Sequence, residues 1–269
     1  MNTQPLTGKR ALVTGASRGI GRAIALALAE AGADVAVLAR GGDALESVAA
    51  EIKDLGRQGV PVVCDVTDPA RIDAAVGEAV DALGGLDIAV NNAGGFNWTG
   101  PFLDMTAADW EEVRGLNLDA SVSLLRRVGA HLTAQGSGSV LNVSSIAGLG
   151  GAPRLSFYAV CKAAMISLTH TLAVEWAASG VRVNAIAPGW IDTALTGSFT
   201  AHDQVRLGLQ SEVPQDRWGR PEDVAGAAVY LSCDGAAFVT GSVLVLDGGL
   251  TSQLSHVARN LLDLGRAAA

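Results

Sequence analysis

Short hydrophobic runs alternate with amphipathic stretches along most of the chain. The runs Arg10–Thr14 (RALVT) and Asp34–Leu38 (DVAVL) lack the polar alternation of a half-exposed strand, which predicts strands buried on both faces. Five further runs are predicted as strands: Val60–Cys64, Leu86–Val90, Ser139–Val143, Val181–Ala185 and Ser242–Leu246. Between them, helices are predicted over Ile20–Ala31, a stretch ending at Leu55, Pro69–Leu83, Ala107–Leu132, Ser156–Ala178 and Pro221–Ser232.

This alternation predicts an α/β protein built from βαβ units. The expected fold is a single doubly wound parallel seven-stranded sheet with helices on both faces, a Rossmann fold. No Pro/Ser/Gly-rich linker divides the chain, so residues 1–269 are predicted to form one domain. Its core would span about 7–250, with a C-terminal tail at 251–269. The segment 190–219 is predicted as a loop and helix region outside the alternation.

Composition narrows the class of protein. Hydrophobic residues make up 49 % and charged residues 17 %, which is too apolar for a disordered chain. The net charge of −8 and the absence of a Lys/Arg run argue against nucleic-acid binding. The N-terminus has no apolar signal core, and Glu30, Gly32 and Asp34 interrupt the most apolar stretch, so no membrane association is expected.

The cysteines and histidines give no metal-binding pattern. Cys64, Cys161 and Cys233 are far apart, and no CxxC or Cys/His spacing occurs. We therefore expect reduced thiols, a cytoplasmic protein and no metal site.

A glycine-rich turn follows the first predicted strand and precedes a helix. Glycines allow a tight turn, and the N-terminus of the helix supplies free N–H groups and a positive dipole end for a phosphate. The alternative is a plain tight turn. The candidate cofactor-binding residues here are Gly15, Ser17, Arg18, Gly19, Ile20 and Gly21.

One tyrosine and one lysine lie four residues apart on the predicted helix 156–178. The chain has only three lysines and two tyrosines, and Tyr158 and Lys162 would share one helix face. A nearby ammonium stabilises phenolate, which makes a tyrosine a usable acid–base group. The YxxxK spacing alone is a common accident, so its meaning depends on the rest of the pattern.

The ordered set of motifs resembles the short-chain dehydrogenase/reductase family over about residues 7–250. The turn has the spacing GxxxGxG and is followed by an Asp-Val pair, Asn-Asn-Ala-Gly, an Asn, Ser-Ser, the YxxxK pair and Pro-Gly. The resemblance implies a catalytic set of Asn117, Ser145, Tyr158 and Lys162, with Ser145 and Tyr158 binding substrate. It also implies further cofactor contacts from Asp65, Val66, Asn91, Ala93, Gly94, Pro188, Gly189, Ile191 and Thr193, together with Tyr158 and Lys162.

Several of these residues have simpler readings. Asp65 could be a helix cap or turn residue, and Asn117 could be an ordinary mid-helix asparagine bonded to the backbone. Ser144 competes with Ser145 and is expected to bond within the strand end. Phe96, Trp98, Arg154, Trp190 and 195–209 resemble the family's variable pocket regions.

Charge at the end of the second strand bears on the cofactor. A carboxylate there would bind the ribose 2′-hydroxyl of NAD, but this chain has Arg40, and Arg18 lies in the glycine turn. Two guanidinium groups suit a 2′-phosphate, which favours NADP(H), with NAD as the alternative.

The resemblance implies interconversion of a ketone and a secondary alcohol by hydride transfer. A 3-oxoacyl reductase-like activity and a sugar or polyol dehydrogenase using NAD both stay open, and a non-catalytic nucleotide-sensing protein is a third reading. The partners expected are a small carbonyl or alcohol substrate and further copies of the chain, as a homotetramer or homodimer.

Overall fold

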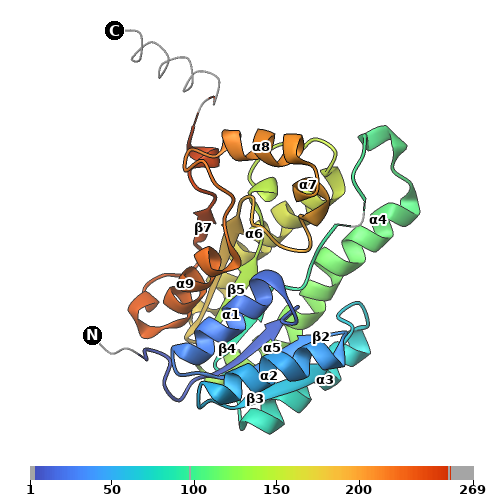
Figure 1. The fold of residues 1–269 in the computed structure, drawn as a ribbon. Helices are drawn as coiled ribbons and strands as arrows, with labels where there is room; N and C mark the ends of the chain where they lie inside the picture. The colour runs from blue at the N-terminus through green and yellow to red at the C-terminus, as the bar shows by residue number, and fades with distance from the viewer. Residues whose placement is uncertain (1–3, 97, 254, 256–269) are drawn as a thin grey trace.

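The fold is built on one seven-stranded sheet (Figure 1). We describe residues 4–96, 98–253 and 255 of the computed structural model. The strands are β1 (Arg10–Thr14), β2 (Asp34–Ala39), β3 (Gly59–Val63), β4 (Ile88–Asn91), β5 (Gly138–Val143), β6 (Val181–Pro188) and β7 (Val243–Leu246). Their order is β3-β2-β1-β4-β5-β6-β7, and every paired strand runs parallel to its neighbour. The predicted parallel doubly wound sheet is therefore confirmed.

Helices cover both faces of the sheet (Figure 1). On one face α1 (Gly19–Glu30) lies between α2 (Gly42–Asp54) and α9 (Pro221–Ser232). The other face carries α3 (Pro69–Leu83), α5 (Ala120–Gln135) and α6 (Ser156–Ala177). Two hydrophobic clusters, one on each side, fill the spaces between these layers. Burial on both faces explains why the strands read as continuous hydrophobic runs.

The strand order reverses between β1 and β4. The chain moves outward from β1 to β2 and β3, then returns to β4 on the other side. The helices that follow β1 and β4 therefore diverge, and a crevice opens beyond the carboxyl ends of the two strands, where open α/β sheets bind ligands. The glycine turn lies at this point, between β1 and α1.

The structure corrects one predicted element. The expected helix Ala107–Leu132 is three pieces: α4 (Ala107–Arg114), a π-helical turn at Gly115–Asp119, and α5. Sequence periodicity cannot reveal the turn, because both flanking segments have ordinary helical patterns. Wide turns of this kind often occur at functional sites.

Two further helices lie in the 190–219 region, above α6 in Figure 1. They are α7 (Gly197–Thr200) and α8 (Asp203–Glu212). Most of the predicted tail lies outside the described residues. Within the described part of the chain, only α6 is long and apolar enough to cross a membrane, and it packs against β6 and carries Tyr158 and Lys162. Its packing in this chain covers only part of it, because 28 % of its most apolar window is buried and Val174 is 80 % exposed.

Candidate functional site

The turn between β1 and α1 can be built only with glycine. Gly15 has φ +64° and Gly19 has φ +57°, in the left-handed region that side chains rarely adopt. A Cβ on Gly15 would lie 2.8 Å from Nδ2 of Asn92, and one on Gly21 would collide with the carbonyl oxygen of Gly15. The first N–H groups of α1 have no side-chain cap, so they are available to an anion.

Thr14 and Asn92 hold this turn in place, and neither was among the predicted site residues. The Thr14 hydroxyl accepts hydrogen bonds from the backbone N–H groups of Asn92 and Ala93, both at 3.0 Å. The Asn92 amide donates to the Thr14 carbonyl at 2.8 Å. These bonds fix the ends of β1 and β4 together on either side of the crevice. A buried threonine directly before the glycine turn was the available sequence signal.

Asn91 points into the protein interior. Its amide donates to Oδ1 of Asn142 at 3.0 Å, and the Asn142 amide donates to the Thr169 hydroxyl on α6 at 2.9 Å. All three residues are buried. The side chain of Asn91 therefore connects β4, β5 and α6, which leaves its backbone as the part that could face a cofactor.

Two arginines lie near the carboxyl ends of β1 and β2. Arg18 and Arg40 are exposed, and neither forms an ion pair within the described residues. Asp65 forms a turn in which its Oδ1 accepts from the Thr67 N–H at 3.0 Å and the Thr67 hydroxyl at 2.8 Å. These bonds, helped by the charge of Arg40, hold the pKa of Asp65 below its usual range. The predicted turn reading of Asp65 is thus correct, and Val66 beside it is buried.

The π-helical turn brings Asn117 against the segment after β4. The Asn117 amide donates to the carbonyl oxygens of Gly95, at 2.7 Å, and Val113, at 2.8 Å, and its Oδ1 accepts from the Gly95 N–H at 3.0 Å. The bond to Val113 is the local backbone contact expected of a mid-helix asparagine. The two bonds to Gly95 are long-range, so Asn117 also positions the loop that carries Gly94.

Gly94 separates Asn117 from Lys162. A Cβ at this position would lie 2.9 Å from Oδ1 of Asn117 and 3.3 Å from Nζ of Lys162. The site therefore requires glycine here, although its φ is not positive. Ala93 lies next to it, beside Thr14.

Tyr158 and Ser145 meet above the carboxyl end of β5. Burial raises the pKa of Tyr158 to about 12, and a hydrogen bond with the Ser145 side chain opposes this rise. Ser145 Oγ also accepts from the N–H of Ala147 at 3.1 Å, which fixes the serine at the end of its strand. The structure thus joins the two residues that the sequence separates by thirteen positions.

Lys162 lies beneath the tyrosine ring. Its Nζ is 5.4 Å from the centroid of that ring and donates to the Val143 carbonyl at 2.9 Å. Burial lowers the pKa of Lys162 to about 8. Ser144 was expected to bond within the strand end. Its hydroxyl instead donates to the Lys162 carbonyl at 2.9 Å. It thereby connects the end of β5 to the turn of α6 that carries the lysine.

The segment after β6 lies beside the glycine turn. A Cβ on Gly19 would lie 3.4 Å from Cγ2 of Thr193, and Gly189 is pinned by a bond from its N–H to the Leu246 carbonyl at 3.0 Å. Pro188 ends β6, and Ile191 is buried and pairs with Gly219. Thr193 therefore lies beside the glycine turn, whereas Gly189 and Ile191 contact the segments around Leu246 and Gly219.

A series of aromatic contacts leads away from Tyr158. The ring centroid of Phe96 lies 5.4 Å from that of Tyr158 and 5.9 Å from that of Phe199 on α7. Phe199 in turn lies 5.7 Å from Trp190, which lies 5.7 Å from Trp218. Phe199 lies in the stretch 195–209 that resembles the family's variable pocket regions, whereas Trp218 was not singled out, because an aromatic residue in a loop region gives no periodic signal.

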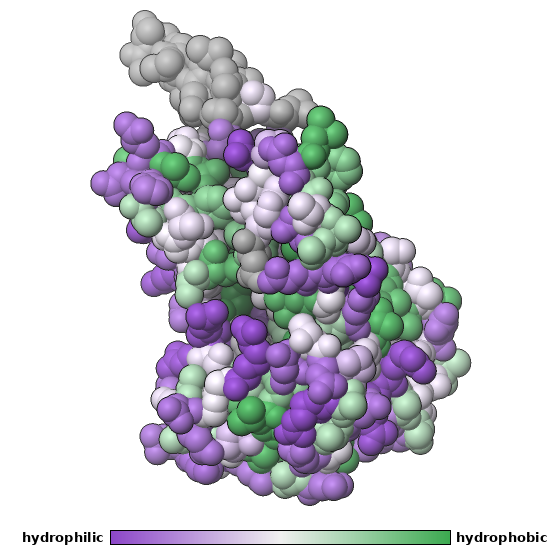
Figure 2. Space-filling model, turned by 90° about the vertical axis from the view of Figure 1, so that its right-hand side faces the viewer, coloured by the Kyte–Doolittle hydropathy of each residue, from purple (hydrophilic) through white to green (hydrophobic). Residues whose placement is uncertain are grey.

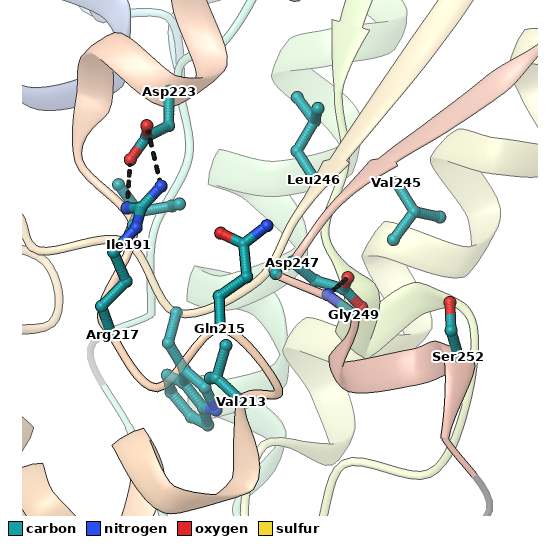
Figure 3. Close-up of a pocket in the computed structure, with 13 residues that line it drawn as sticks. Ile191, Val213, Gln215, Arg217, Asp223, Val245, Leu246, Asp247, Gly249 and Ser252 are labelled. Carbon is teal, nitrogen blue, oxygen red and sulfur yellow. Dashed lines mark hydrogen bonds and ion pairs between the residues drawn. The ribbon is translucent and has the colours of Figure 1, made fainter.

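A separate cavity of about 450 Å³ has Trp190 and Ile191 among its lining residues (Figure 3). It is bordered by the end of β7, the loop before α9 and an ion pair between Arg217 and Asp223. None of the four catalytic candidates lines it.

Figure 2 shows a hollow with hydrophobic side chains at its floor, below the part of the molecule that holds α7 and α8. Within the described residues, no cluster of His, Cys, Asp or Glu could hold a metal ion.

Comparisons with known proteins agree with this geometry. Residues 15–251 match the family model described as enoyl-(acyl carrier protein) reductase. The chain is 40 % identical to the 2-dehydro-3-deoxy-D-gluconate 5-dehydrogenase of Pseudoalteromonas atlantica, over 91 % of this chain and 96 % of that protein. It is also 40 % identical to the cis-4-hydroxycyclohexanecarboxylate dehydrogenase of Sinomonas cyclohexanicum, over 90 % and 96 %.

Solved structures give the same result. The gluconate 5-dehydrogenase of Burkholderia cenocepacia, in complex with NADP and tartrate, superimposes with a TM-score of 0.89 at 34 % identity, covering 94 % of this chain and 99 % of that one. The fold and the relatives are those of an oxidoreductase that works with a nicotinamide cofactor. Within that class, the chain belongs to the short-chain dehydrogenase/reductase family.

Proposed function

We propose that this protein interconverts a ketone and a secondary alcohol with NADP(H), using Tyr158, Lys162, Ser145 and Asn117. The observation that supports this most is the convergence of the tyrosine, serine and lysine at the carboxyl end of β5, beside the crevice at the glycine turn. The nicotinamide supplies the hydride when it is bound. Every other step belongs to side chains of this chain.

Tyr158 exchanges the proton. In reduction its phenol donates a proton to the carbonyl oxygen of the substrate, and in oxidation its phenolate accepts one from the alcohol. Ser145 donates a hydrogen bond to the same substrate oxygen and stabilises the negative charge that develops on it. Lys162, when protonated, stabilises the phenolate and lowers the pKa of the tyrosine from its buried value. Asn117 holds the Gly95 backbone and keeps Gly94 beside the lysine.

The crevice fits a dinucleotide. The uncapped N–H groups of α1 would hold the pyrophosphate, and glycine at positions 15, 21 and 94 allows the close backbone packing that shapes this edge of the crevice. Arg18 and Arg40 would bind the 2′-phosphate of NADP, and NAD is the alternative. The remaining contacts would come from Ser17, Gly19, Ile20, Asp65, Val66, Asn91, Ala93, Tyr158, Lys162, Pro188, Gly189, Ile191 and Thr193.

The natural substrate is a small carbonyl or alcohol. The named activities of the relatives concern sugar acids, a hydroxycyclohexane carboxylate and, at 36–37 % identity, 3-oxoacyl-(acyl carrier protein) reduction, and the family model is also named for acyl carrier protein. Acyl carrier protein is acidic, and the net charge of −8 on this chain disfavours that partner.

The protein would act as one domain in the cytoplasm and assemble as a homodimer or homotetramer. Val174 on α6 is 80 % exposed, and β7 is the last strand of the sheet with Leu244 exposed on it. Apolar surface on these two elements would be covered by further copies of the chain.

The direct test is a spectrophotometric assay of NADPH and NADH oxidation over a panel of ketones, with NADP⁺ and NAD⁺ reduction over secondary alcohols. We expect turnover that favours the phosphorylated cofactor. Tight NADPH binding without turnover of any carbonyl or alcohol would instead support a nucleotide-sensing protein.

A further inference from the structure

We infer that Phe96 selects substrates with an apolar carbon skeleton, such as alicyclic secondary alcohols and ketones, over polyhydroxylated sugar acids. The inference rests on the proposed function and concerns the space next to Tyr158. Phe96 lies one residue after Gly95, in the loop that leaves β4, and its ring lies edge-on to the ring of Tyr158.

The position of Phe96 is fixed by the backbone before it. Gly95 makes hydrogen bonds at both its N–H and its carbonyl with the buried amide of Asn117. The side chain of Leu195 also reaches this glycine, because a Cβ there would lie 3.4 Å from its Cδ1. The backbone directly before Phe96 is therefore held by Asn117, one of the four proposed catalytic residues.

Phe96, Phe199 and Trp190 together form an aromatic wall next to Tyr158. Phe199 joins it from α7 and Trp190 joins it from the segment after β6, so three separate loops contribute one ring each. Together these three rings offer a single polar hydrogen, the indole N–H of Trp190. Thr193 and Thr196, which lie nearby in sequence, direct their polar atoms to each other and to the backbone.

Chemistry at this wall separates two classes of substrate. A ring or alkyl chain gains free energy when it leaves water for an aromatic surface. A sugar acid carries a hydroxyl on each neighbouring carbon, and each hydroxyl placed against Phe96 or Phe199 would lose its water without finding a partner. A hydrophobic pocket discriminates against an added hydroxyl by about 100-fold, so the wall favours the apolar substrate.

The test compares 4-methylcyclohexanol with D-gluconate as substrates for NADP⁺ reduction by the wild-type enzyme. We expect kcat/KM to be at least about 100-fold higher for 4-methylcyclohexanol. A wild-type enzyme that prefers gluconate overturns the inference and leaves the proposed function standing. An enzyme that turns over no carbonyl or alcohol overturns both.

Substitutions assign the preference to Phe96. We expect Phe96→Ala to lower kcat/KM for 4-methylcyclohexanol by about 10- to 100-fold, mainly through KM, with little change for gluconate. Phe96→Leu, which keeps an apolar side chain, should retain most of the preference. Phe102→Ala is the matched control, because Phe102 is 64 % exposed and contacts Phe157 instead of the tyrosine. NADPH affinity and Tm show whether each variant is folded. Equal losses for both substrates in Phe96→Ala would overturn the assignment.

Discussion

Arginines at the two edges of the sheet differ in whether they form ion pairs with carboxylates. At the amino edge, Arg10 forms an ion pair with Asp87 at 2.8 Å, and Arg57 forms one with Asp34 at 2.9 Å. At the carboxyl edge, Arg18 and Arg40 have no ion pair within the described residues. The same residue type therefore closes the fold at one edge and is left available to an anionic ligand at the other.

A buried lysine and a half-buried arginine extend the comparison. Arg182, at the start of β6, donates to the carbonyl oxygens of Leu231, Val239 and Cys233, at the end of α9 and beyond it. Lys162 likewise bonds to a carbonyl, and burial lowers the pKa of both groups. The difference is the neighbour: Lys162 lies beneath a tyrosine ring. Both cations are held by carbonyl oxygens, but only Lys162 has a tyrosine ring beside it on which its charge can act.

The largest effect is expected at the carboxyl edge, from loss of one hydroxyl. Tyr158→Phe should lower kcat by about 10³-fold or more, because it removes the hydroxyl that transfers the proton. NADPH affinity, followed by fluorescence titration, should stay within about threefold. Tyr230→Phe is the control, since Tyr230 is the only other tyrosine and lies on α9. Near-normal turnover by Tyr158→Phe would contradict the mechanism.

Arg40→Asp should change the cofactor preference next most strongly. It removes a charged donor for the 2′-phosphate and adds a like charge, so the ratio of kcat/KM for NADP⁺ to that for NAD⁺ should fall by about 100-fold. The comparison variant is Arg126→Asp, which changes an exposed arginine on α5. An unchanged ratio would mean that Arg40 does not bind the 2′-phosphate.

At the amino edge the same type of change should affect stability instead. Arg10→Met leaves the carboxylate of Asp87, which is only 18 % exposed, without its partner. The free energy of unfolding should fall by about 1–3 kcal/mol in urea denaturation, with the cofactor ratio unchanged. Arg40→Met should change it by no more than about 0.5 kcal/mol. Equal destabilisation by the two variants would remove the contrast between the edges.

The smallest effect is expected from Lys162→Met, which should change how the free energy of unfolding depends on pH. Its pKa is about 8 in the folded protein and has its ordinary value of 10.5 in the unfolded chain. Between these values the unfolded state binds more protons, so the free energy of unfolding rises with pH through this window. The difference between wild type and Lys162→Met should therefore grow by about 1 kcal/mol per pH unit. Urea denaturation at pH 7.5, 8.5 and 9.5 measures it, and a flat difference would show that Lys162 has an ordinary pKa.

The sheet and the order of the site residues could be predicted because each depends on local pattern. Buried strands read as hydrophobic runs, and the glycine turn occupies a fixed place after the first of them. The π-helical turn could not be predicted, since Gly115–Asp119 has no residue type that distinguishes it from an α-helix. Thr14 and Asn92 were missed for another reason: their bonds join strands that are 78 residues apart. The contacts of Phe96 with Phe199 and Tyr158 depend on loop positions that have no periodicity.

The π-helical turn also limits how this site could be shortened or transplanted. Such a turn holds one residue more than the α-helix it interrupts. Deleting Leu116 would restore a continuous α-helix between α4 and α5, and each residue of an α-helix advances the side-chain direction by about 100°. Asn117 would then point away from Gly95, or α5 would lose its fit against α3. A protein engineer who grafts the four catalytic side chains onto a regular helical scaffold would therefore have to carry over the extra residue as well.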